Sequence, residues 1–451
     1  MGYKTITAED IKNPEDIKTI EFLRGVLTRC REKLTAAGAD RFVLNASRSM
    51  LNEFNVGAGE FTLFRTLYSD SLSVTAYVGA RRGVISGNKL DDEDIDAVVE
   101  SVIASANAAE PDDAWVVAPK EENRIFQKGA PECDTDGLFA KFKEFLEDTK
   151  RDYPLILLEE AVSSHNHVCN VFLNSSGTEF VTIAGQYGVD LMFSGHEGDN
   201  ASSFVGEGFV TDDLSRPFIS QSRIAESFDE TQKQICTESF EGKFTGTLVA
   251  PPGLLLTLLY SALDNFASDI TILNGTSIWK DKLGTQVADP RLTVSFLPST
   301  ELLPDGEPYT SEGFPSKDYS IIENGILRNF NIAAYIANKT GFERAPNYGS
   351  NLVVAAGETP LEDIIASIDK GIYVGRFSGG EPSVNGDFSG VAKNSFLIEN
   401  GKLTKPLRET MIAGNLAELL LNIGQISVET VNDGVTVLPY VSFPDVTISG
   451  K

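Results

Sequence analysis

Histidine and cysteine are common zinc ligands, and one short stretch of this sequence brings both together. In "SSHNHVCNVF", His165, His167 and Cys169 alternate with other residues. Side chains on a β-strand point alternately to opposite faces, so these three would share one face. Imidazole and thiolate groups on one face make the stretch a candidate metal site. The alternative is an exposed or edge strand, because neither of its two faces is clearly apolar.

Other motifs for metal or nucleophilic chemistry are missing. The third histidine, His196, is followed by Glu197 and then by Gly-Asp-Asn, so the sequence has no HExxH. It also has neither a G-x-S-x-G nucleophile elbow nor a GxxxxGK[ST] phosphate loop. A zinc site needs three or four converging ligands and supporting hydrogen bonds. Metal binding at His165, His167 and Cys169 is therefore an alternative and not the preferred interpretation.

A glycine-rich stretch, "GRFSGGEPSVNGDFSG", begins at Gly375. Glycines allow the backbone to approach a ligand closely. No Lys-Ser/Thr pair and no helix start follow the stretch, so a phosphate cradle is not expected. Taken alone, it is most simply a long turn that leads into a hairpin.

The elements that must position these residues can be read from hydrophobic spacing. Helices are predicted at 13–38, with Asn13 as the N-cap, and at 91–109. They lie on either side of strands at 41–86, which makes a compact α+β unit. Residues 111–135 carry three prolines and little periodicity, as in a linker. A second unit has a helix near 136–150, strands from 155 to about 210 and a helix near 218–236.

The remainder of the chain is rich in predicted strands. Two segments share Ile-Glu-Asn-Gly, and Asn324-Gly325 and Asn400-Gly401 predict tight hairpins of type I′. "PPGLLLTLLYSALDNF", residues 251–266, predicts a helix that is buried because its leucines lie on every side. We therefore predict an α+β fold, in which a two-part α/β region precedes a β-rich C-terminal domain. The predicted boundaries are 1–110, 111–240 and 241–451.

Composition restricts the function. Among 451 residues, 65 are acidic and 38 are basic, and the formal net charge is −27. Such a surface repels phosphate backbones, so no nucleic-acid partner is expected. No apolar run approaches the roughly 20 residues that span a bilayer. The absence of a signal-like segment and the four scattered cysteines predict a cytoplasmic protein without disulfides or a membrane partner.

Four C-terminal segments together resemble the TldD/PmbA family, whose members are often described as modulators of DNA gyrase. The segments, in order, are "GTSIWKDKLGTQVADPRLTV", "SEGFPSKDYSIIENGILRNF", "GDFSGVAKNSFLIENGK" and "LRETMIAGNLAELL". The chain is more similar to the PmbA branch, also called TldE. The first 240 residues resemble the family only in their layout.

This resemblance implies a metalloprotease system. In the TldD branch, an HExxxH helix and a cysteine near the C-terminus hold the metal. In this chain the corresponding position falls on "YSALDN", so the degenerate metal-site positions are Tyr260, Ser261, Asp264 and Asn265. No histidine follows His196 and no cysteine follows Cys236. The expectation is that this chain has no catalytic residues, metal or cofactor, and that zinc is held by a TldD-type partner.

The resemblance also implies a partner and a substrate. We expect a non-catalytic TldE-type subunit that pairs with a TldD-type subunit and helps to admit an unfolded or extended peptide. The glycine-rich stretch then becomes a candidate peptide-binding loop, with Gly375, Ser378, Gly379, Gly380 and Gly386. In isolation the chain is expected to form a homodimer. The alternatives are an autonomous hydrolase with a non-standard metal site and a regulatory protein that binds DNA gyrase.

Overall fold

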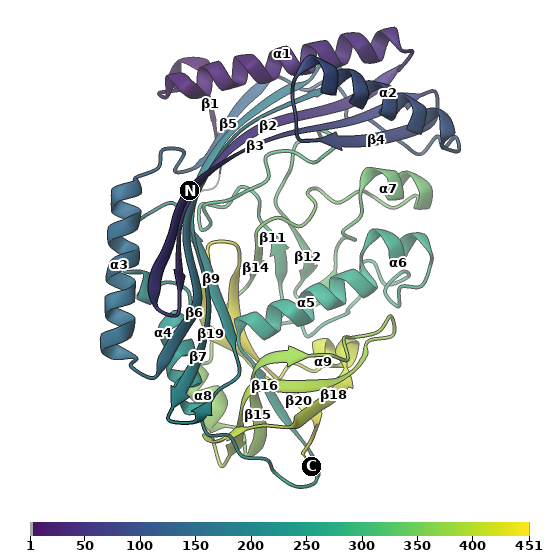
Figure 1. Cartoon of the computed structure of the whole chain (residues 1–451). Coiled ribbons are helices and arrows are strands. Elements are labelled where there is room, and N and C mark those ends of the chain that lie inside the picture. The colour runs from purple at the N-terminus through teal and green to yellow at the C-terminus, as the bar shows by residue number, and fades with distance from the viewer. Residues whose placement is uncertain (1–2, 451) are drawn as a thin grey trace.

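The computed structural model of the chain describes residues 3–450, so the outermost residues of the two predicted terminal domains lie outside the described part. Within residues 3–450 the strands form two sheets, one of nine strands and one of eleven (Figure 1). Helices cover both, and the predicted α+β class with a β-rich C-terminal domain is confirmed. None of the helices in this range combines the length and the apolar character that a membrane crossing requires.

The first sheet has the strand order β1-β5-β7-β6-β2-β3-β4, and β8 and β9 pair with β7. Its strands are β1 (Tyr3–Ile6), β2 (Arg41–Gly57), β3 (Glu60–Val78), β4 (Arg81–Gly87), β5 (Arg124–Gly129), β6 (Ile156–Asn174), β7 (Glu179–Glu197), β8 (Asn200–Ala201) and β9 (Val205–Thr211). β2 of the first predicted domain pairs with β6 of the second along its length, from Val43 opposite Asn174 to Gly57 opposite Glu160. Both N-terminal regions thus contribute to one sheet, and the boundaries near residues 110 and 240 stay predictions.

Two predictions for this region were wrong in detail. The stretch taken as a linker contains β5, which pairs with β1 and lies parallel to β7. Its sequence, "RIFQKG", lacks the clean alternation that reveals a strand, and both of its partners are distant in sequence. β6 was offered as an exposed or edge strand, but it lies in the interior of the sheet between β2 and β7.

Four helices cover one face of the first sheet. They are α1 (Pro14–Ala36), α2 (Asp92–Ala108), α3 (Thr135–Asp152) and α4 (Ile224–Lys233). The predicted cap of α1 is confirmed, because the Asn13 side chain accepts a hydrogen bond from the Glu15 amide. The helix predicted near 218–236 is shorter than expected and begins at Ile224.

The helices are divided between the two ends of this face. α1 and α2 share a core with Val181 and Ile183 of β7, whereas α3 and α4 share one with Val189 and Leu191. All four β7 residues are spaced by even numbers, so both helix pairs lie on the same face. Figure 1 shows α1 and α2 at the top of the sheet and α3 lower on the left, with the middle of the face left open between them.

The second sheet belongs to the C-terminal region. Its strands are β10 (Lys243–Ala250), β11 (Val294–Phe296), β12 (Tyr319–Glu323), β13 (Ile326–Leu327), β14 (Leu352–Val354), β15 (Lys370–Ser378), β16 (Asp387–Glu399), β17 (Lys402–Leu407), β18 (Thr410–Asn415), β19 (Ile426–Asn432) and β20 (Val437–Ser449). The helices of this region are α5 (Pro252–Phe266), α6 (Asp269–Leu273), α7 (Ala334–Thr340), α8 (Leu361–Ala366) and α9 (Leu416–Leu421).

The two Asn-Gly turns are confirmed as tight turns. Asn324 and Gly325 have φ values of 50° and 77°, and Asn400 and Gly401 have values of 50° and 73°. Two consecutive positive φ angles are what a type I′ turn requires. The first turn joins β12 to β13, and the second joins β16 to β17.

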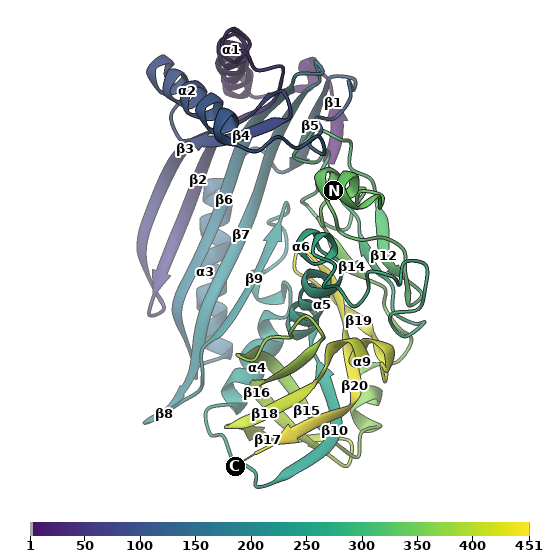
Figure 2. The ribbon, with the colours of Figure 1, turned by 90° about the vertical axis from the view of Figure 1, so that its right-hand side faces the viewer.

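The C-terminal region lies against the face of the first sheet that the helices leave uncovered (Figure 2). Tyr309 packs on Phe172 and Phe180, and its hydroxyl accepts a hydrogen bond from the Asn170 amide at 3.0 Å. At the other end, the Val210 amide of β9 donates to the Asp433 carbonyl at 2.8 Å. The first sheet and the C-terminal region face each other across the space between these two contacts.

Candidate functional site

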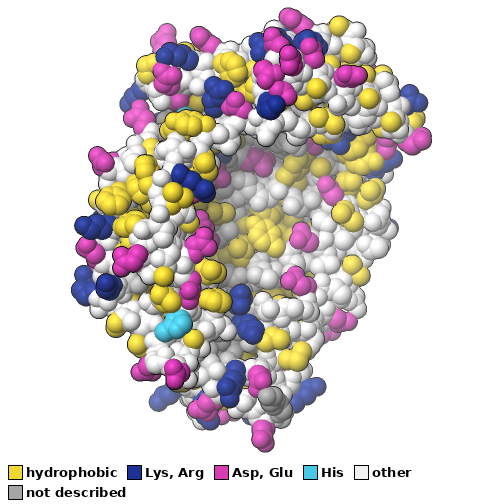
Figure 3. All heavy atoms as spheres, in the orientation of Figure 1, with side chains coloured by type: hydrophobic (Ala, Val, Ile, Leu, Met, Phe, Trp, Pro, Cys, Tyr) yellow, Lys and Arg dark blue, Asp and Glu magenta, His cyan; other side chains and the backbone are white. Residues whose placement is uncertain are grey.

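A cleft of about 520 Å³ lies between the first sheet and the C-terminal region. Its walls come from β7, β9 and α4 on one side, and from β15, β19, β20 and the first turns of α5 on the other. Figure 3 shows the molecule hollowed between these two regions. The cleft brings together side chains that are more than 200 residues apart in sequence, such as Glu207 and Asp433.

Helix α5 presents one polar stripe and is otherwise buried. Gly253, Thr257, Tyr260 and Asp264 are exposed, and their spacing places them along one face of the helix. Gly253 and Thr257 line the cleft. The prediction that this helix is buried on every side was therefore wrong for this stripe, because the leucines leave one row of the helix to small and polar residues.

The four predicted degenerate positions lie at the C-terminal half of α5. The Asn265 amide donates to the Ser261 carbonyl at 2.9 Å and to the Pro382 carbonyl at 3.2 Å. Burial raises the pKa of the Tyr260 phenol, and Asp433 and Asp264 raise it further. Burial also raises the pKa of Asp264. Both groups are therefore less ready to become the anions that a metal ion would bind.

These residues do not fit a zinc ion. They offer a phenol, a hydroxyl, a carboxylate and an amide, whereas zinc prefers nitrogen and sulfur ligands. The amide is already bonded to two carbonyl groups. Within residues 3–450, the group of three metal-ligand types that converge within 4.8 Å lies elsewhere, on the first sheet. Helix α5 thus has no donor set to activate a water molecule.

The glycine-rich loop lies next to this helix. Gly375 lines the cleft, and the Pro382 carbonyl of the loop accepts the hydrogen bond from Asn265. Gly380 has a φ of 63°, and a Cβ atom there would come within 1.6 Å of the Ser389 carbonyl. Glycine is therefore required by the turn itself. The structure brings the two predicted sites together, and peptide binding by Ser378, Gly379 and Gly386 stays a prediction.

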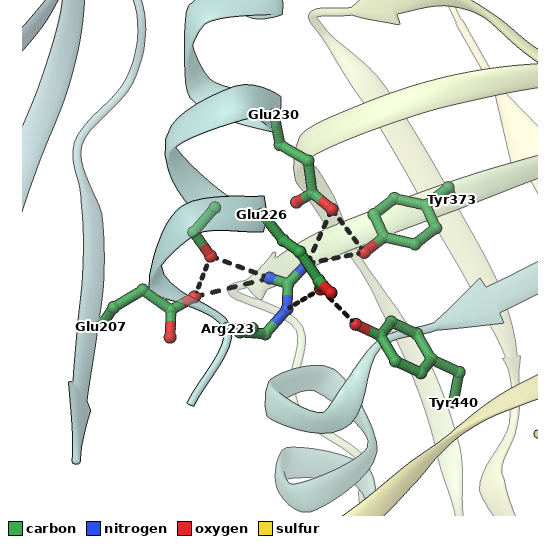
Figure 4. Close-up of polar contacts among 7 residues, drawn as sticks. Glu207, Arg223, Glu226, Glu230, Tyr373 and Tyr440 are labelled. Carbon is green, nitrogen blue, oxygen red and sulfur yellow. Dashed lines mark hydrogen bonds and ion pairs between the residues drawn. The ribbon is translucent and has the colours of Figure 1, made fainter. Parts of the chain in front are cut away.

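A buried charge cluster in the cleft wall was not predicted (Figure 4). The Arg223 guanidinium donates through Nη2 to Glu230 Oε1 at 2.6 Å and to the Tyr373 hydroxyl at 2.9 Å. Its Nη1 reaches Glu207 Oε1 at 3.4 Å. Tyr440 donates to Glu226 Oε2 at 2.7 Å. These contacts fasten α4 to β15 and β20, and so hold the two walls of the cleft together.

The electrostatics of this cluster follow from its burial. Arg223 is 9% exposed and has carboxylates on two sides. Burial raises the pKa of Glu207, although Arg223 and Ser227 act in the opposite direction. Arg223, Glu226 and Glu230 are spaced three and four residues apart, which could have suggested an ion-paired helix face. The sequence does not indicate that Glu207, Tyr373 and Tyr440, which lie on other strands, contact this helix.

The predicted His-His-Cys trio is only partly brought together. His165 is buried, and its Nε2 lies 2.8 Å from the Ala130 carbonyl oxygen. His167 and Cys169 instead meet Asp16 of α1: Asp16 Oδ1 is 2.9 Å from His167 Nε2 and 3.6 Å from Cys169 Sγ. Asp16 was not among the predicted ligands, because it lies about 150 residues before the strand.

The C-terminal region and the whole chain are similar to known proteins. Residues 243–450 match the PmbA/TldA metallopeptidase C-terminal domain. A metalloprotease PmbA homologue of Haemophilus influenzae is 24% identical over 375 residues, which cover 78% of this chain and 80% of that protein. A zinc metalloprotease TldD homologue of Saccharolobus solfataricus is 28% identical over 193 residues, which cover 40% of this chain and 43% of that protein.

Two solved structures share the whole fold. The crystal structure of TldE from Thermococcus kodakarensis has a TM-score of 0.81 at 21% identity, and the match covers 95% of this chain and 100% of that one. A candidate modulator of DNA gyrase from Bacteroides thetaiotaomicron has a TM-score of 0.81 at 22% identity, with 95% and 99% covered.

Proposed function

We propose that this chain, which belongs to the TldD/PmbA family, is the non-catalytic TldE-type subunit of a TldD–TldE metalloprotease. A TldD-type partner supplies the zinc and the catalytic residues. This chain completes the assembly and helps to admit an unfolded or extended peptide to the shared site.

One observation carries this proposal. The C-terminal half of α5, whose first turns line the cleft, holds Tyr260, Ser261, Asp264 and Asn265. These side chains lack the imidazole and thiolate ligands of a zinc peptidase. Zinc hydrolysis needs ligands for the ion, an open position for water and a carboxylate that accepts a proton. In the proposed assembly this chain contributes the cleft, and another chain contributes the zinc-dependent hydrolysis.

The glycine-rich loop is the proposed contact for the peptide. Gly375 and Ser378 belong to β15, Gly379 and Gly380 follow it, and Gly386 directly precedes β16. The loop touches α5 through Pro382. Extended peptides bind well beside strands, because their backbone groups pair with those of the strand. The loop is anchored by its own hydrogen bonds, so it offers a fixed surface.

A surface suited to assembly lies on the first sheet. β4 pairs with β3 only from Leu72 to Val78, so the stretch from Glu60 to Ser71 is an open strand edge among the described residues. This stretch exposes five large apolar side chains: Phe61, Leu63, Phe64, Leu67 and Tyr68. An open apolar edge favours pairing with another chain. We propose that it binds the TldD-type subunit, and that it pairs with itself in the homodimer.

The experiment for the function is a peptidase assay with three samples. These are the chain alone, a TldD-type subunit from the same organism, and their mixture, each with an unfolded protein as substrate. We expect chelator-sensitive cleavage in the mixture and none by the chain alone. A mixture in which the glutamate of the partner's HExxxH is replaced serves as the control. Chelator-sensitive cleavage by this chain alone would overturn the assignment.

The assembly surface has its own test. Leu63→Lys with Leu67→Lys places two charges on the open edge, and Leu403→Lys, at a similarly exposed residue of the C-terminal region, is the matched control. Light scattering should show a dimer for the unmodified chain and for Leu403→Lys, and a 48.9 kDa monomer for the double variant. A concentration-independent monomer for the unmodified chain would contradict the proposed self-pairing.

A regulatory role on DNA gyrase is the remaining alternative, because a protein of similar structure carries that description. The net charge of −27 opposes direct contact with DNA. Binding to gyrase that needs no TldD-type subunit, together with an inactive mixture, would favour this alternative.

A further inference from the structure

The middle of the first sheet holds a cluster that the proposed function does not use. His167 and Cys169 of β6 lie on the helix-covered face, beside the first turn of α1. Figure 1 shows that α1 and α3 lie apart on this face. Asp16, from the first turn of α1, reaches down to both. Asp16 is 5% exposed and Cys169 is 1% exposed, so these groups are not ordinary surface polar residues.

We propose that Asp16, His167 and Cys169, called here the N-terminal cluster, bind a divalent zinc-type metal ion. Each residue contributes one atom: a carboxylate oxygen, the Nε2 of an imidazole and a thiolate sulfur. These are three of the ligand types that zinc uses in proteins. The inference is independent of the proposed function, and it departs from the sequence-based expectation that this chain holds no metal.

The geometry of the three atoms suits one ion. Their separations are 2.9 Å between Asp16 Oδ1 and His167 Nε2, 3.6 Å between Asp16 Oδ1 and Cys169 Sγ, and 3.7 Å between His167 Nε2 and Cys169 Sγ. Zinc bonds of about 2.0–2.3 Å at tetrahedral angles place ligand atoms about 3.3–3.6 Å apart. Only the oxygen and the nitrogen need to separate, by a few tenths of an ångström, for an ion to fit between all three.

Space for a fourth ligand lies beside the cluster. The three residues line a cavity of about 690 Å³, together with Arg48, Tyr68 and Asp70 of β2 and β3. Arg48 is engaged by Asp70 through two hydrogen bonds of 2.7 and 2.8 Å, so its charge is compensated. Sites with three protein ligands and one open position accept water or another small ligand there.

One feature limits the strength of the site. The Nδ1 atom of His167 is buried and has no hydrogen-bond partner within the described residues. Metal-binding histidines usually donate this N–H group to a second residue, and losing that partner typically costs about 10–100-fold in affinity. We therefore expect an ion that a strong chelator removes completely.

The competing explanation is purely structural. The Asp16 carboxylate also receives a hydrogen bond from Asn13 at 3.3 Å, so the contact with His167 could simply fix the start of α1 on the sheet. That role needs the carboxylate and the imidazole, but it does not need the thiol. Cys169→Ser therefore separates the two explanations.

The test uses the full chain, stripped with chelator and then titrated with zinc and, separately, with cobalt. We expect one ion per chain, and a sulfur-to-cobalt charge-transfer band in the near ultraviolet. His167→Ala and Cys169→Ser should each lower zinc affinity by at least about 100-fold, because even supporting partners are worth about 10–100-fold. Cys169→Ser should also abolish the charge-transfer band.

Cys236→Ser, at the exposed cysteine, is the matched control and should leave both readouts unchanged. Circular dichroism of each variant reports whether it is folded. The proposal is overturned if the unmodified chain binds no zinc. It is also overturned if a folded Cys169→Ser chain keeps the unmodified affinity and the cobalt band. None of these readouts depends on peptidase activity, so failure here leaves the TldE-type assignment untouched.

Discussion

Helix α5 and the N-terminal cluster both border open space beside a sheet, but they differ in what converges there. Helix α5 is where the family resemblance predicts a degenerate metal site, and its exposed stripe offers only the hydroxyl of Thr257, the phenol of Tyr260 and the carboxylate of Asp264. In the N-terminal cluster only His167 and Cys169 could be recognised from the sequence, yet an imidazole, a thiol and the Asp16 carboxylate lie within 4.8 Å of one another. Metal binding in this chain is therefore expected where suitable side chains converge, and not at the helix that the family resemblance suggested.

The two places also differ in how their charges are held. The wall of the cleft contains Arg223, Glu207 and Glu230, which satisfy one another and bind the two regions of the chain together. In the N-terminal cluster, a bound cation would balance the Asp16 carboxylate and the thiolate that Cys169 forms when it loses its proton to bind the metal. Removing charge should therefore harm the cleft wall, whereas adding a cation should help the cluster.

The largest effect is expected for Arg223→Ala. Removing the guanidinium leaves buried carboxylates without a cation, and breaking a buried pair in this way typically costs about 3–5 kcal/mol. Urea unfolding should show this loss, while zinc affinity at the N-terminal cluster stays unchanged. Tyr373→Phe keeps the guanidinium and removes two hydrogen bonds, one accepted from Arg223 and one donated to Glu230. It should cost less, about 0.5–1.5 kcal/mol for each bond. Equal costs for the two variants would contradict the role given to the charge.

A smaller effect is expected when zinc is added to the metal-free chain. A ligand at 100 times its dissociation constant stabilises a folded protein by about 2.7 kcal/mol. Thermal unfolding should therefore shift upward for the unmodified chain and for Cys236→Ser, but not for Cys169→Ser. A shift of the same size in Cys169→Ser would place the stabilising ion somewhere else.

The smallest effect is expected on α5. Tyr260→Phe and Asp264→Asn change exposed polar groups and should alter the free energy of unfolding by no more than about 0.5 kcal/mol. Zinc content should also stay unchanged, because these side chains hold no ion. Leu259→Ala, on the buried side of the same helix, should cost about 2–5 kcal/mol and shows that the measurement is sensitive. Loss of bound zinc in Asp264→Asn would contradict our interpretation of α5.

The sequence predicted well wherever a local rule applied. The Asn13 cap, the two Asn-Gly turns and the long helices depend on neighbouring residues, so their signals lie within a few positions of one another. No histidine follows His196 in the sequence, and the absence of a zinc site in the C-terminal region stays a prediction.

Predictions failed where distant segments meet. β5 pairs with strands that are far away in sequence, and α5 keeps a polar stripe because the cleft borders it. His167 and Cys169 share a face of β6 as the alternation predicted, but they meet Asp16 and not His165, since α1 crosses the sheet at that point. Metal binding there stays a proposal. Spacing along one strand shows which side chains share a face, whereas the neighbouring element decides which of them meet.

The most direct test of the difference between α5 and the N-terminal cluster uses the His167→Ala/Cys169→Ser double variant. This variant removes two proposed metal ligands of the cluster and leaves α5 unchanged. The measurement is its zinc content after expression in zinc-replete medium, followed by a peptidase assay on an unfolded protein with and without a TldD-type subunit. We predict no stoichiometric zinc, no cleavage by the variant alone, and cleavage once the partner is added. One zinc per chain with chelator-sensitive cleavage by the variant alone would contradict the account.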